Sequence, residues 1–388
     1  MKVAVTTLAF CVAALLALGL VMLYSASMTM VDQRTHSEVG AHYLRLQLVW
    51  CAFGFVLCLA ATALDYQWLN KAAWPLFIFA LVLLALVLLP LPHGITKKIN
   101  GAHRWFILPG MRLQPSEFAK LALIIMLAWY GDRCQRQMQT WKRGVILPGL
   151  LIVSVLGLVF VEPDRGTTIL LAAVSGSLLL AAGVRWKHVL IPAAAGAAAL
   201  AASILHDPMR MRRIFSWWNL EEHKDGVGYQ AYQAMIALGS GGWTGLGLGN
   251  GRQKLGFVPE HHTDFIFSII GEELGLVATL LVVVAFVVVA ICGIYIALNS
   301  RDTFGFLLAL GITLLISLQA AINIGVVTSA LPNKGLPLPF ISYGGSNLLA
   351  MFAGVGLLFS VARHAPVREK IAEPVIEAGG NPFAARVT

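Results

Sequence analysis

Long apolar stretches, more than any single motif, limit what this chain can fold into. Ten of them follow one another, at residues 3–24, 44–64, 73–92, 115–131, 144–161, 166–184, 187–205, 265–297, 303–330 and 344–363. Because a helix needs roughly 20 apolar residues to span the hydrocarbon core of a bilayer, each stretch is expected to cross a membrane. The ten-residue segments of alternating polarity that are typical of a membrane β-barrel do not occur in the sequence. The sequence therefore predicts an all-α polytopic membrane protein with about ten transmembrane helices.

The composition excludes a soluble globular protein. Apolar residues make up 58% of the chain and charged residues 12%, and the mean hydropathy is +0.77. Soluble domains average about 25% charged residues, and a soluble enzyme of this size would need that charge to cover its surface. The net charge of +9 favours anionic lipid headgroups or a phosphate-bearing substrate as partners, and no nucleic acid.

The polar connections predict one membrane domain over residues 1–363, followed by a C-terminal tail over residues 364–388. Two connections are long, 93–114 and 206–264, and the second lies between the seventh and eighth spans. The short loops 132–143 and 185–187 are rich in Lys and Arg, which favours a cytoplasmic location for them, for both termini and for the tail. The two long loops are then extracytoplasmic on a plasma membrane.

The strongest catalytic candidate stands at the end of the second long loop. Asp264 follows Glu260, His261 and His262 and directly precedes the apolar residues 265–267. A carboxylate held against apolar side chains has a raised pKa, which suits a general base. Two other interpretations stay open: Thr263 or Asp264 could cap the next helix, or the two histidines could bind a metal, although adjacent residues point to different faces of a helix.

Two further clusters lie at the ends of predicted spans. At the start of the fourth span, Ser116 is expected to cap the helix, and Glu117 and Lys120 lie on one face of it. Charges at a span edge form a structural ion pair or mark a functional cavity. The Pro- and Gly-rich connection 331–346 carries Lys334 and Ser342, which serve either substrate binding or a rigid turn.

The second long loop holds the remaining candidates. Its segment 206–218 is basic and aromatic and is expected to lie flat in the headgroup region, with Arg210, Arg212 and Arg213 toward phosphates. Further along, Gln233, Arg252 and Lys254 are candidate substrate-binding residues. The Gly-rich run between them has no preceding strand and no following G-K-[ST], which excludes a nucleotide site. In the ninth span, Gln319 and Asn323 are expected to form interhelical hydrogen bonds.

Five stretches, taken in order, resemble the SEDS family of bacterial shape, elongation, division and sporulation proteins. They are Asn100–Trp105, Gln114–Lys120, Glu162–Thr168, Pro259–Phe267 with Gly271–Gly275, and Leu338–Ser346. Three others resemble the division-type members of the family more than the elongation-type members, namely Tyr24–Met28, Ile236–Gly242 and Lys334–Phe340.

The resemblance implies a fold of ten helices with a large extracytoplasmic loop before the eighth. It implies a peptidoglycan glycosyltransferase that polymerises lipid II, a disaccharide-pentapeptide on undecaprenyl pyrophosphate, during septal cell-wall synthesis. The partner it implies is a class B penicillin-binding protein, which crosslinks the new strand. The essential aspartate of the family falls on Asp264, and its paired charges fall on Glu117 and Lys120.

Such a transfer inverts the anomeric carbon, because the sugar is α-linked in lipid II and β-linked in glycan. Inversion requires a base for the acceptor hydroxyl and no covalent nucleophile, and Asp264 is the expected base. Cations or a divalent metal (Mg²⁺ or Mn²⁺) would stabilise the departing pyrophosphate, and no organic cofactor is needed. The candidate pyrophosphate contacts are Lys120, Arg252, Lys254 and Lys334. The alternatives are a lipid II flippase, an elongation-type polymerase and a non-catalytic scaffold.

Overall fold

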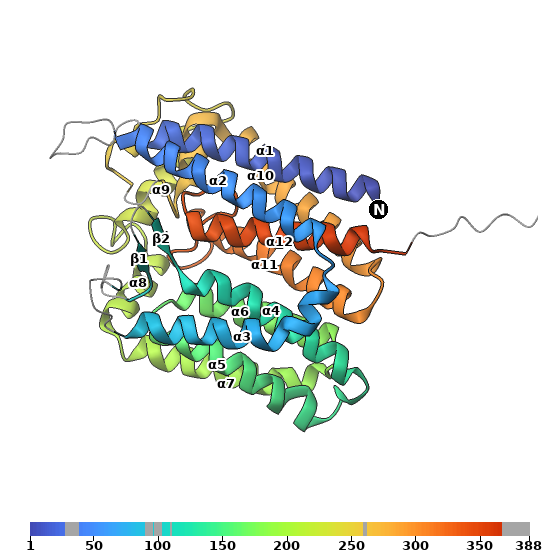
Figure 1. Cartoon of the computed structure of the whole chain (residues 1–388). Coiled ribbons are helices and arrows are strands. Elements are labelled where there is room, and N and C mark those ends of the chain that lie inside the picture. The colour runs from blue at the N-terminus through green and yellow to red at the C-terminus, as the bar shows by residue number, and fades with distance from the viewer. Residues whose placement is uncertain (28–38, 90–95, 97–102, 109–110, 259–261, 367–388) are drawn as a thin grey trace, which may run out of the picture.

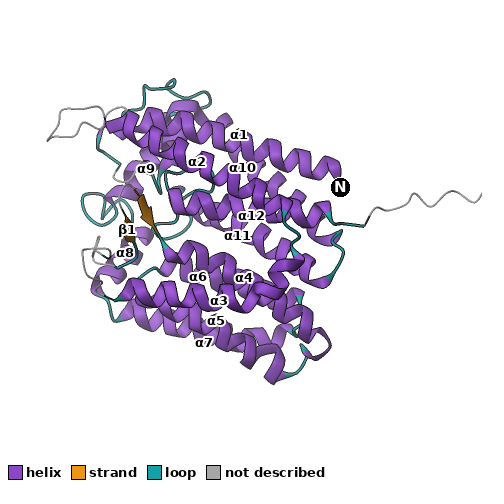
Figure 2. Cartoon of the chain, in the orientation of Figure 1, coloured by secondary structure: helices purple, strands orange, loops and turns teal. Residues whose placement is uncertain are grey.

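The computed structural model describes residues 1–27, 39–89, 96, 103–108, 111–258 and 262–366. These residues form a bundle of long helices that run roughly side by side, with short helices and one small hairpin gathered at one end (Figure 1, Figure 2). The N-terminus and the end of the last helix lie at the opposite end of the bundle (Figure 1). Of the predicted tail, only residues 364–366 are among those described.

The long helices follow the order of the predicted spans. Their bounds are α1 Lys2–Ser27, α2 Val39–Ala63, α3 Gln67–Leu88, α4 Pro115–Cys134, α5 Leu147–Val161, α6 Arg165–Ala181, α7 Trp186–Leu205, α10 Ile266–Leu298, α11 Thr303–Val327 and α12 Gly345–Arg363. Short helical turns η2 (Gln135–Gln137) and η3 (Lys142–Ile146) join α4 to α5, and η3 extends α5 toward its N-terminus.

Every predicted span coincides with a helix. Among the described residues, eight helices are long and apolar enough to cross a membrane. The other two are α6, which is short, and α4, which has the length but carries Glu117, Lys120, Asp132 and Arg133. The chain is a multi-pass membrane protein.

Two predictions at helix starts, one boundary and one cap, were wrong. The third helix begins at Gln67 rather than at residue 73, because its first turn is mixed in polarity and reads as a loop. The fourth begins at Pro115 after the extended residue Gln114, so Ser116 lies inside the first turn instead of capping it. Proline suits this position because its missing N–H would have no partner in the first turn of a helix.

The centre of the bundle is formed by α4, α11 and α12. Most residues of these helices are buried, whereas no residue of α7 is buried. Helix α12 packs on α2, and α11 packs on both α10 and α4 (Figure 1). The buried helices carry the polar side chains that support the candidate site, whereas α7 presents an apolar surface to its surroundings.

The second long loop folds over one end of the bundle. It contains α8 (Pro208–Trp218), α9 (Tyr229–Ser240) and the turn η4 (Gln253–Leu255). At the same end, the first long loop forms a hairpin of β1 (Phe106–Leu108) and β2 (Met111–Leu113), with Phe106 opposite Leu113 (Figure 2). This hairpin was not predicted from the sequence, although Pro109-Gly110 between two short apolar runs is a turn signal.

Helix α10 has the unusual length expected of the eighth span, with 33 residues, but it is broken near its start. Gly275 has φ 77° and ψ −173°, which only glycine adopts readily. A Cβ at this position would lie 2.5 Å from the Trp243 carbonyl oxygen, so the loop backbone packs directly against the break. The first turns of α10, with Glu272 and Glu273, are therefore covered by the loop rather than by lipid.

Candidate active site

Asp264 lies in the turn that leads from the second long loop into α10. Its side chain is half-buried, and the cap position of α10 is occupied by Phe265. Capping of the helix therefore does not explain why an aspartate stands here. Glu260 and His261, which belong to the same predicted cluster, lie outside the described residues.

The backbone around Asp264 is held by α11 and by the segment 333–344. The Asn323 Nδ2 of α11 donates to the Asp264 carbonyl oxygen at 2.8 Å and to the Leu336 carbonyl oxygen at 2.7 Å. The Ser342 hydroxyl donates to the Thr263 carbonyl oxygen at 2.6 Å and accepts from the Leu338 N–H at 2.8 Å. Asn323 and Ser342 are buried, so these hydrogen bonds fix the position of the turn.

The Asp264 carboxylate lies against Gly335. A Cβ added to that glycine would come within 2.6 Å of the carboxylate oxygen Oδ2, so no other residue fits there without displacement. The backbone of the 333–344 segment therefore approaches the carboxylate more closely than a side chain would permit. This contact links the two stretches of chain that the sequence singled out separately.

Asp264 lines a pocket of about 360 Å³ between the bundle and the short helices. Its walls come from α8, α9, the turn before α10 and the 333–344 segment, through Met209, Arg213, Gln230, Asp264, Asn333 and Gly335. Asn333 Nδ2 donates to Gln230 Oε1 at 3.4 Å, which joins two of these walls. The pocket thus surrounds one carboxylate with groups from four distant parts of the sequence.

Two cations accompany this carboxylate. Arg213 lines the pocket and is exposed, and Lys334 stands between the lining residues Asn333 and Gly335 with its own side chain half-buried. Neither forms an ion pair or a side-chain hydrogen bond with any residue that the structure describes. Burial lowers the pKa of the Lys334 ammonium, because desolvation penalises the charged form. An anionic ligand would therefore neutralise positive charge of Arg213 and Lys334 that no described residue pairs with.

The predicted pair of Glu117 and Lys120 is confirmed, and it is fully enclosed. Lys120 has 0% exposure, and its Nζ lies 2.8 Å from Glu117 Oε2 and 3.0 Å from Gln319 Oε1. Asn347 Nδ2 donates to the same Glu117 oxygen at 2.9 Å, and Gln319 Nε2 donates to the Pro337 carbonyl oxygen at 2.9 Å. The pair therefore supports the 333–344 segment from inside the bundle and does not line the pocket.

Lys254 is likewise paired away from the pocket. Its Nζ lies 2.7 Å from Glu273 Oε1, 2.8 Å from the Gly249 carbonyl oxygen and 3.0 Å from Ser25 Oγ. Arg252 is exposed, and its backbone N–H donates to Glu272 Oε1 at 2.7 Å. These contacts fasten the second long loop to the first turns of α10. A phosphate could reach Lys254 only if its buried ion pair opened.

Gln233 lies on α9 and is half-buried, but Gln230, one turn earlier, is the glutamine that lines the pocket. Arg213 is a charged pocket residue that the sequence did not single out for the substrate, since the whole of segment 206–218 was expected to serve as an interface anchor. The positive charge of that segment was the available signal, but only the fold shows which arginine lines the pocket.

A divalent cation fits this site only as an ion that comes with a phosphate ligand. The described residues contain no group of three or more His, Cys, Asp or Glu side chains able to hold a metal, and Asp264 is the one carboxylate among the described pocket residues. Mg²⁺ is commonly bound by one or two carboxylates together with substrate phosphates. The donor set is compatible with that mode of binding and not with a metal cage built by the protein alone.

A second carboxylate is buried near the same end of the bundle, between α5 and α6. Glu162 has 0% exposure, and neither of its carboxylate oxygens has a hydrogen-bond partner among the described residues. Burial, together with the charge of Asp164, raises its pKa to about 8, and Arg104 opposes this shift. Arg104 donates instead to the Glu162 and Pro163 carbonyl oxygens, both at 2.7 Å.

Comparison with known proteins agrees with this architecture. The chain is 41% identical over 351 residues to a protein of Trichlorobacter lovleyi named probable peptidoglycan glycosyltransferase FtsW, covering 90% of this chain and 91% of the relative. A solved chain from a peptidoglycan synthase complex, described as coordinating polymerization and crosslinking, matches with a TM-score of 0.76 and 30% identity, over 92% of this chain and 96% of that one.

The rod shape determining protein RodA of Thermus thermophilus matches with a TM-score of 0.68 and 29% identity, over 93% of this chain and 97% of that one. The family model that describes cell cycle proteins of the FtsW, RodA and SpoVE type matches residues 6–366. This chain belongs to the FtsW/RodA/SpoVE family.

Proposed function

We propose that this chain is a peptidoglycan glycosyltransferase that polymerises lipid II into glycan strands during septal wall synthesis. The observation that carries the proposal is the pocket lined by the half-buried Asp264 and by Arg213, with Lys334 between two other lining residues; neither cation has an ion-pair or side-chain hydrogen-bond partner among the described residues. The relative from Trichlorobacter lovleyi, which bears the name of such an enzyme, supports it over most of the chain.

In this reaction Asp264 acts as the general base. Its carboxylate takes the proton from the acceptor hydroxyl, whose oxygen then forms a bond with the anomeric carbon of the donor sugar. The bond from that carbon to the pyrophosphate oxygen breaks on the opposite face, so the configuration inverts. The hydrogen bond from Asn323 to the Asp264 backbone carbonyl and the close approach of Gly335 to the carboxylate position Asp264 for this proton transfer.

Pyrophosphate departs as an anion, so the site needs positive charge rather than a second carboxylic acid. We assign this role to Lys334 and Arg213, the two cations beside the pocket that have no described partner. Fixed cations stabilise charge that develops in the transition state. A divalent ion, if one accompanies the substrate, would be held by Asp264 and the phosphates and would add to the same stabilisation.

The other candidates support the walls of the pocket. Lys120 and Glu117 sustain the 333–344 segment through Gln319, and Ser342 fixes the turn that carries Asp264. Arg252 stays a candidate contact for the outer part of the substrate because its side chain is exposed. Gln233, which is half-buried on α9, also stays a candidate.

We also propose that the pocket lies on the extracytoplasmic face and that the chain works with a class B penicillin-binding protein, which crosslinks the product. The basic short loops near η2 and between α6 and α7 support this orientation, because they lie at the other end of the bundle. The solved relative in a peptidoglycan synthase complex supports the pairing with a crosslinking partner.

The test is gel-resolved polymerisation of labelled lipid II by the purified chain with its cognate penicillin-binding protein. The wild type should give glycan ladders, and Asp264→Asn should lose at least about 100-fold in rate, the usual scale for a general base. Asp207→Asn is the matched control, because Asp207 caps α8 near the pocket without lining it and asparagine caps equally well. Wild-type rates from Asp264→Asn, or no ladder from the wild type, would contradict the proposal.

A further inference from the structure

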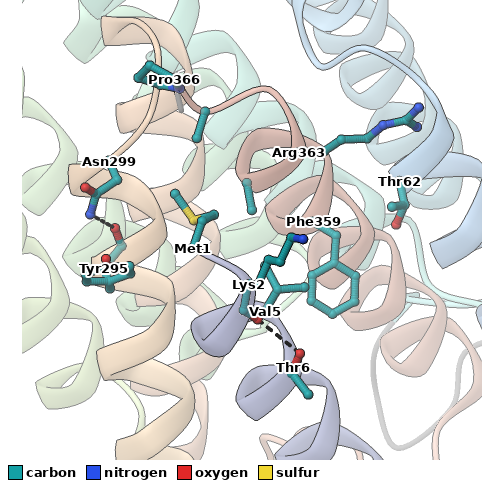
Figure 3. A pocket seen from close by; sticks show the side chains of 12 residues that line it. Met1, Lys2, Val5, Thr6, Thr62, Tyr295, Asn299, Phe359, Arg363 and Pro366 are labelled. Atoms are coloured by element: carbon teal, nitrogen blue, oxygen red, sulfur yellow. Dashed lines mark hydrogen bonds between the residues drawn. The ribbon is translucent and has the colours of Figure 1, made fainter. Parts of the chain in front are cut away.

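A second and larger cavity, of about 760 Å³, lies at the opposite end of the bundle from Asp264. It forms where α1 begins and where α2, α10 and α12 end, and its walls include Lys2, Val5, Thr62, Tyr295, Phe359 and Arg363 (Figure 3). Ligand pockets in proteins are typically about 300–1,000 Å³, so this cavity is large enough for a small ligand or a lipid headgroup.

Three neutral polar side chains of this cavity already donate hydrogen bonds to backbone carbonyl groups one turn earlier in the chain. Thr6 Oγ1 donates to the Lys2 carbonyl oxygen at 3.0 Å, and Asn299 Nδ2 donates to the Tyr295 carbonyl oxygen at 2.8 Å (Figure 3). Thr62 Oγ1 donates to the Cys58 carbonyl oxygen at 2.7 Å. These three donors therefore contribute little to ligand selection, which leaves the Tyr295 hydroxyl and the charged side chains of the lining.

The charge of the lining is positive only. Lys2 and Arg363 are the charged side chains among the described residues that line the cavity, both are exposed, and neither forms an ion pair with a described carboxylate. Asp302, at the same end of the bundle, is engaged by Tyr66, by Gln67 and by the first turn of α11. The cavity therefore offers two cations that no described acidic residue neutralises.

The helix termini do not account for this charge. A cation at a helix C-terminus complements the helix dipole, which would explain Arg363 in the last turn of α12. Lys2, however, begins α1, where the dipole disfavours a positive charge. A negative group from outside α1 would therefore stabilise the Lys2 ammonium at this position.

The cavity also adjoins the surface that faces the hydrocarbon of the membrane. Val5 and Phe359 give it apolar walls, and on the neighbouring surfaces of α1 and α10 the side chains of Val3 and Leu298 are 80% and 69% exposed. An occupant that enters from this side brings hydrocarbon with it. Apolar walls beside a pair of cations match a molecule with acyl chains and an anionic headgroup.

We propose that this cavity binds the headgroup of an anionic phospholipid, such as phosphatidylglycerol, with Lys2 and Arg363 contacting the phosphate. Basic pockets between transmembrane helices are a recognised setting for anionic headgroups. The cavity is separated from Asp264 by the length of the bundle, so this lipid is distinct from the substrate of the proposed transfer reaction (Figure 1).

The test is native mass spectrometry of the full chain with phosphatidylglycerol or phosphatidylcholine of identical acyl chains. The wild type should retain phosphatidylglycerol at least tenfold more tightly. Lys2→Gln/Arg363→Gln should lose this preference, since one cation near anionic lipid is worth roughly a factor of five. The matched control is Arg136→Gln/Arg301→Gln, which removes two exposed cations at the same end of the bundle but outside the cavity and should keep the preference.

The melting temperature of each variant in detergent separates loss of the lipid site from loss of the fold. Wild-type preference for phosphatidylglycerol in Lys2→Gln/Arg363→Gln would overturn the proposal, and so would equal retention of the two lipids by the wild type. Displacement of phosphatidylglycerol by a soluble poly-glutamate peptide at comparable concentration would identify an acidic protein segment as the occupant and overturn the lipid assignment.

Discussion

At the scale of single residues, Glu162 shows how a buried carboxylate changes the response of the fold to pH. Its ordinary pKa of 4.5 is raised to about 8 in the folded chain, chiefly by desolvation and then by the charge of Asp164. Between these two values the unfolded chain has released the proton and the folded chain still holds it. The free energy of unfolding therefore falls as the pH rises from about 4.5 to about 8, and then levels off.

Glu162→Gln should remove this dependence, because glutamine has nearly the same shape and does not titrate. We expect the variant to gain stability over the wild type as the pH rises from 5 to 8, by up to about 4 kcal/mol at roughly 1.4 kcal/mol per pH unit. Thermal melting across that pH range measures the difference. Glu221→Gln, at an exposed position in the second long loop, is the control and should show a constant difference from the wild type. A constant difference for Glu162→Gln as well would show that the carboxyl is not protonated in the fold.

At the scale of elements, the break in α10 determines where the second long loop attaches. The Leu246 and Gly247 N–H groups donate to the Glu272 and Glu273 carbonyl oxygens, and the Leu276 N–H donates to the Gly242 carbonyl oxygen. A continuous helix would use these carbonyl and N–H groups internally. The break at Gly275 leaves them free to bind the loop, as the positive φ of that residue requires.

Gly275→Ala should therefore loosen the loop from the helix. The added Cβ would meet the Trp243 carbonyl oxygen and the Gly245 nitrogen, and alanine is strained at this φ, so we expect a loss of roughly 2–4 kcal/mol in stability. Gly239→Ala in α9 is the control, because a Cβ there meets nothing within 4 Å, and it should be neutral or slightly stabilising. The two variants are compared by thermal melting, and equal melting temperatures would refute this account of the break.

At the scale of the whole molecule, one buried ion pair connects the central helices. Glu117 and Lys120 of α4 bind Asn347 of α12 and Gln319 of α11, so removal of one charge leaves the other without compensation. Lys120→Met should cost about 3–5 kcal/mol in stability, and Glu117→Gln/Lys120→Met should recover part of that loss. Thermal melting of both variants checks the energy.

The same double variant separates support of the pocket from substrate binding. If Lys120 only sustains the 333–344 segment, Glu117→Gln/Lys120→Met should polymerise lipid II within a few-fold of the wild type. A stable double variant without activity would contradict a role for the pair that is limited to stability of the fold.

The sequence predicted the helices of the bundle more completely than it predicted the residues of the pocket. Hydropathy is a local property, so the spans were located, and the largest error in a helix start, at Gln67, falls where a first turn is mixed in polarity. Asp264 stood out because its own neighbours are apolar. Arg213 did not, because 51 positions of chain separate it from Asp264 and only the folded loop brings them to one pocket. The ion pair of Lys254 was not predicted, because its partner Glu273 lies 19 positions further on.

The origin of the pocket walls in distant segments has a consequence for the synthesis of the protein. The walls of the pocket include residues of α8, which begins at Pro208, and Gly335. Ribosomes add about 5–20 residues per second. Between roughly 6 and 25 seconds therefore separate the emergence of its first wall from that of its last. During this interval the nascent chain has already threaded most of its helices into the bilayer but has no complete reaction centre. The enzyme thus becomes competent only when its insertion is nearly finished.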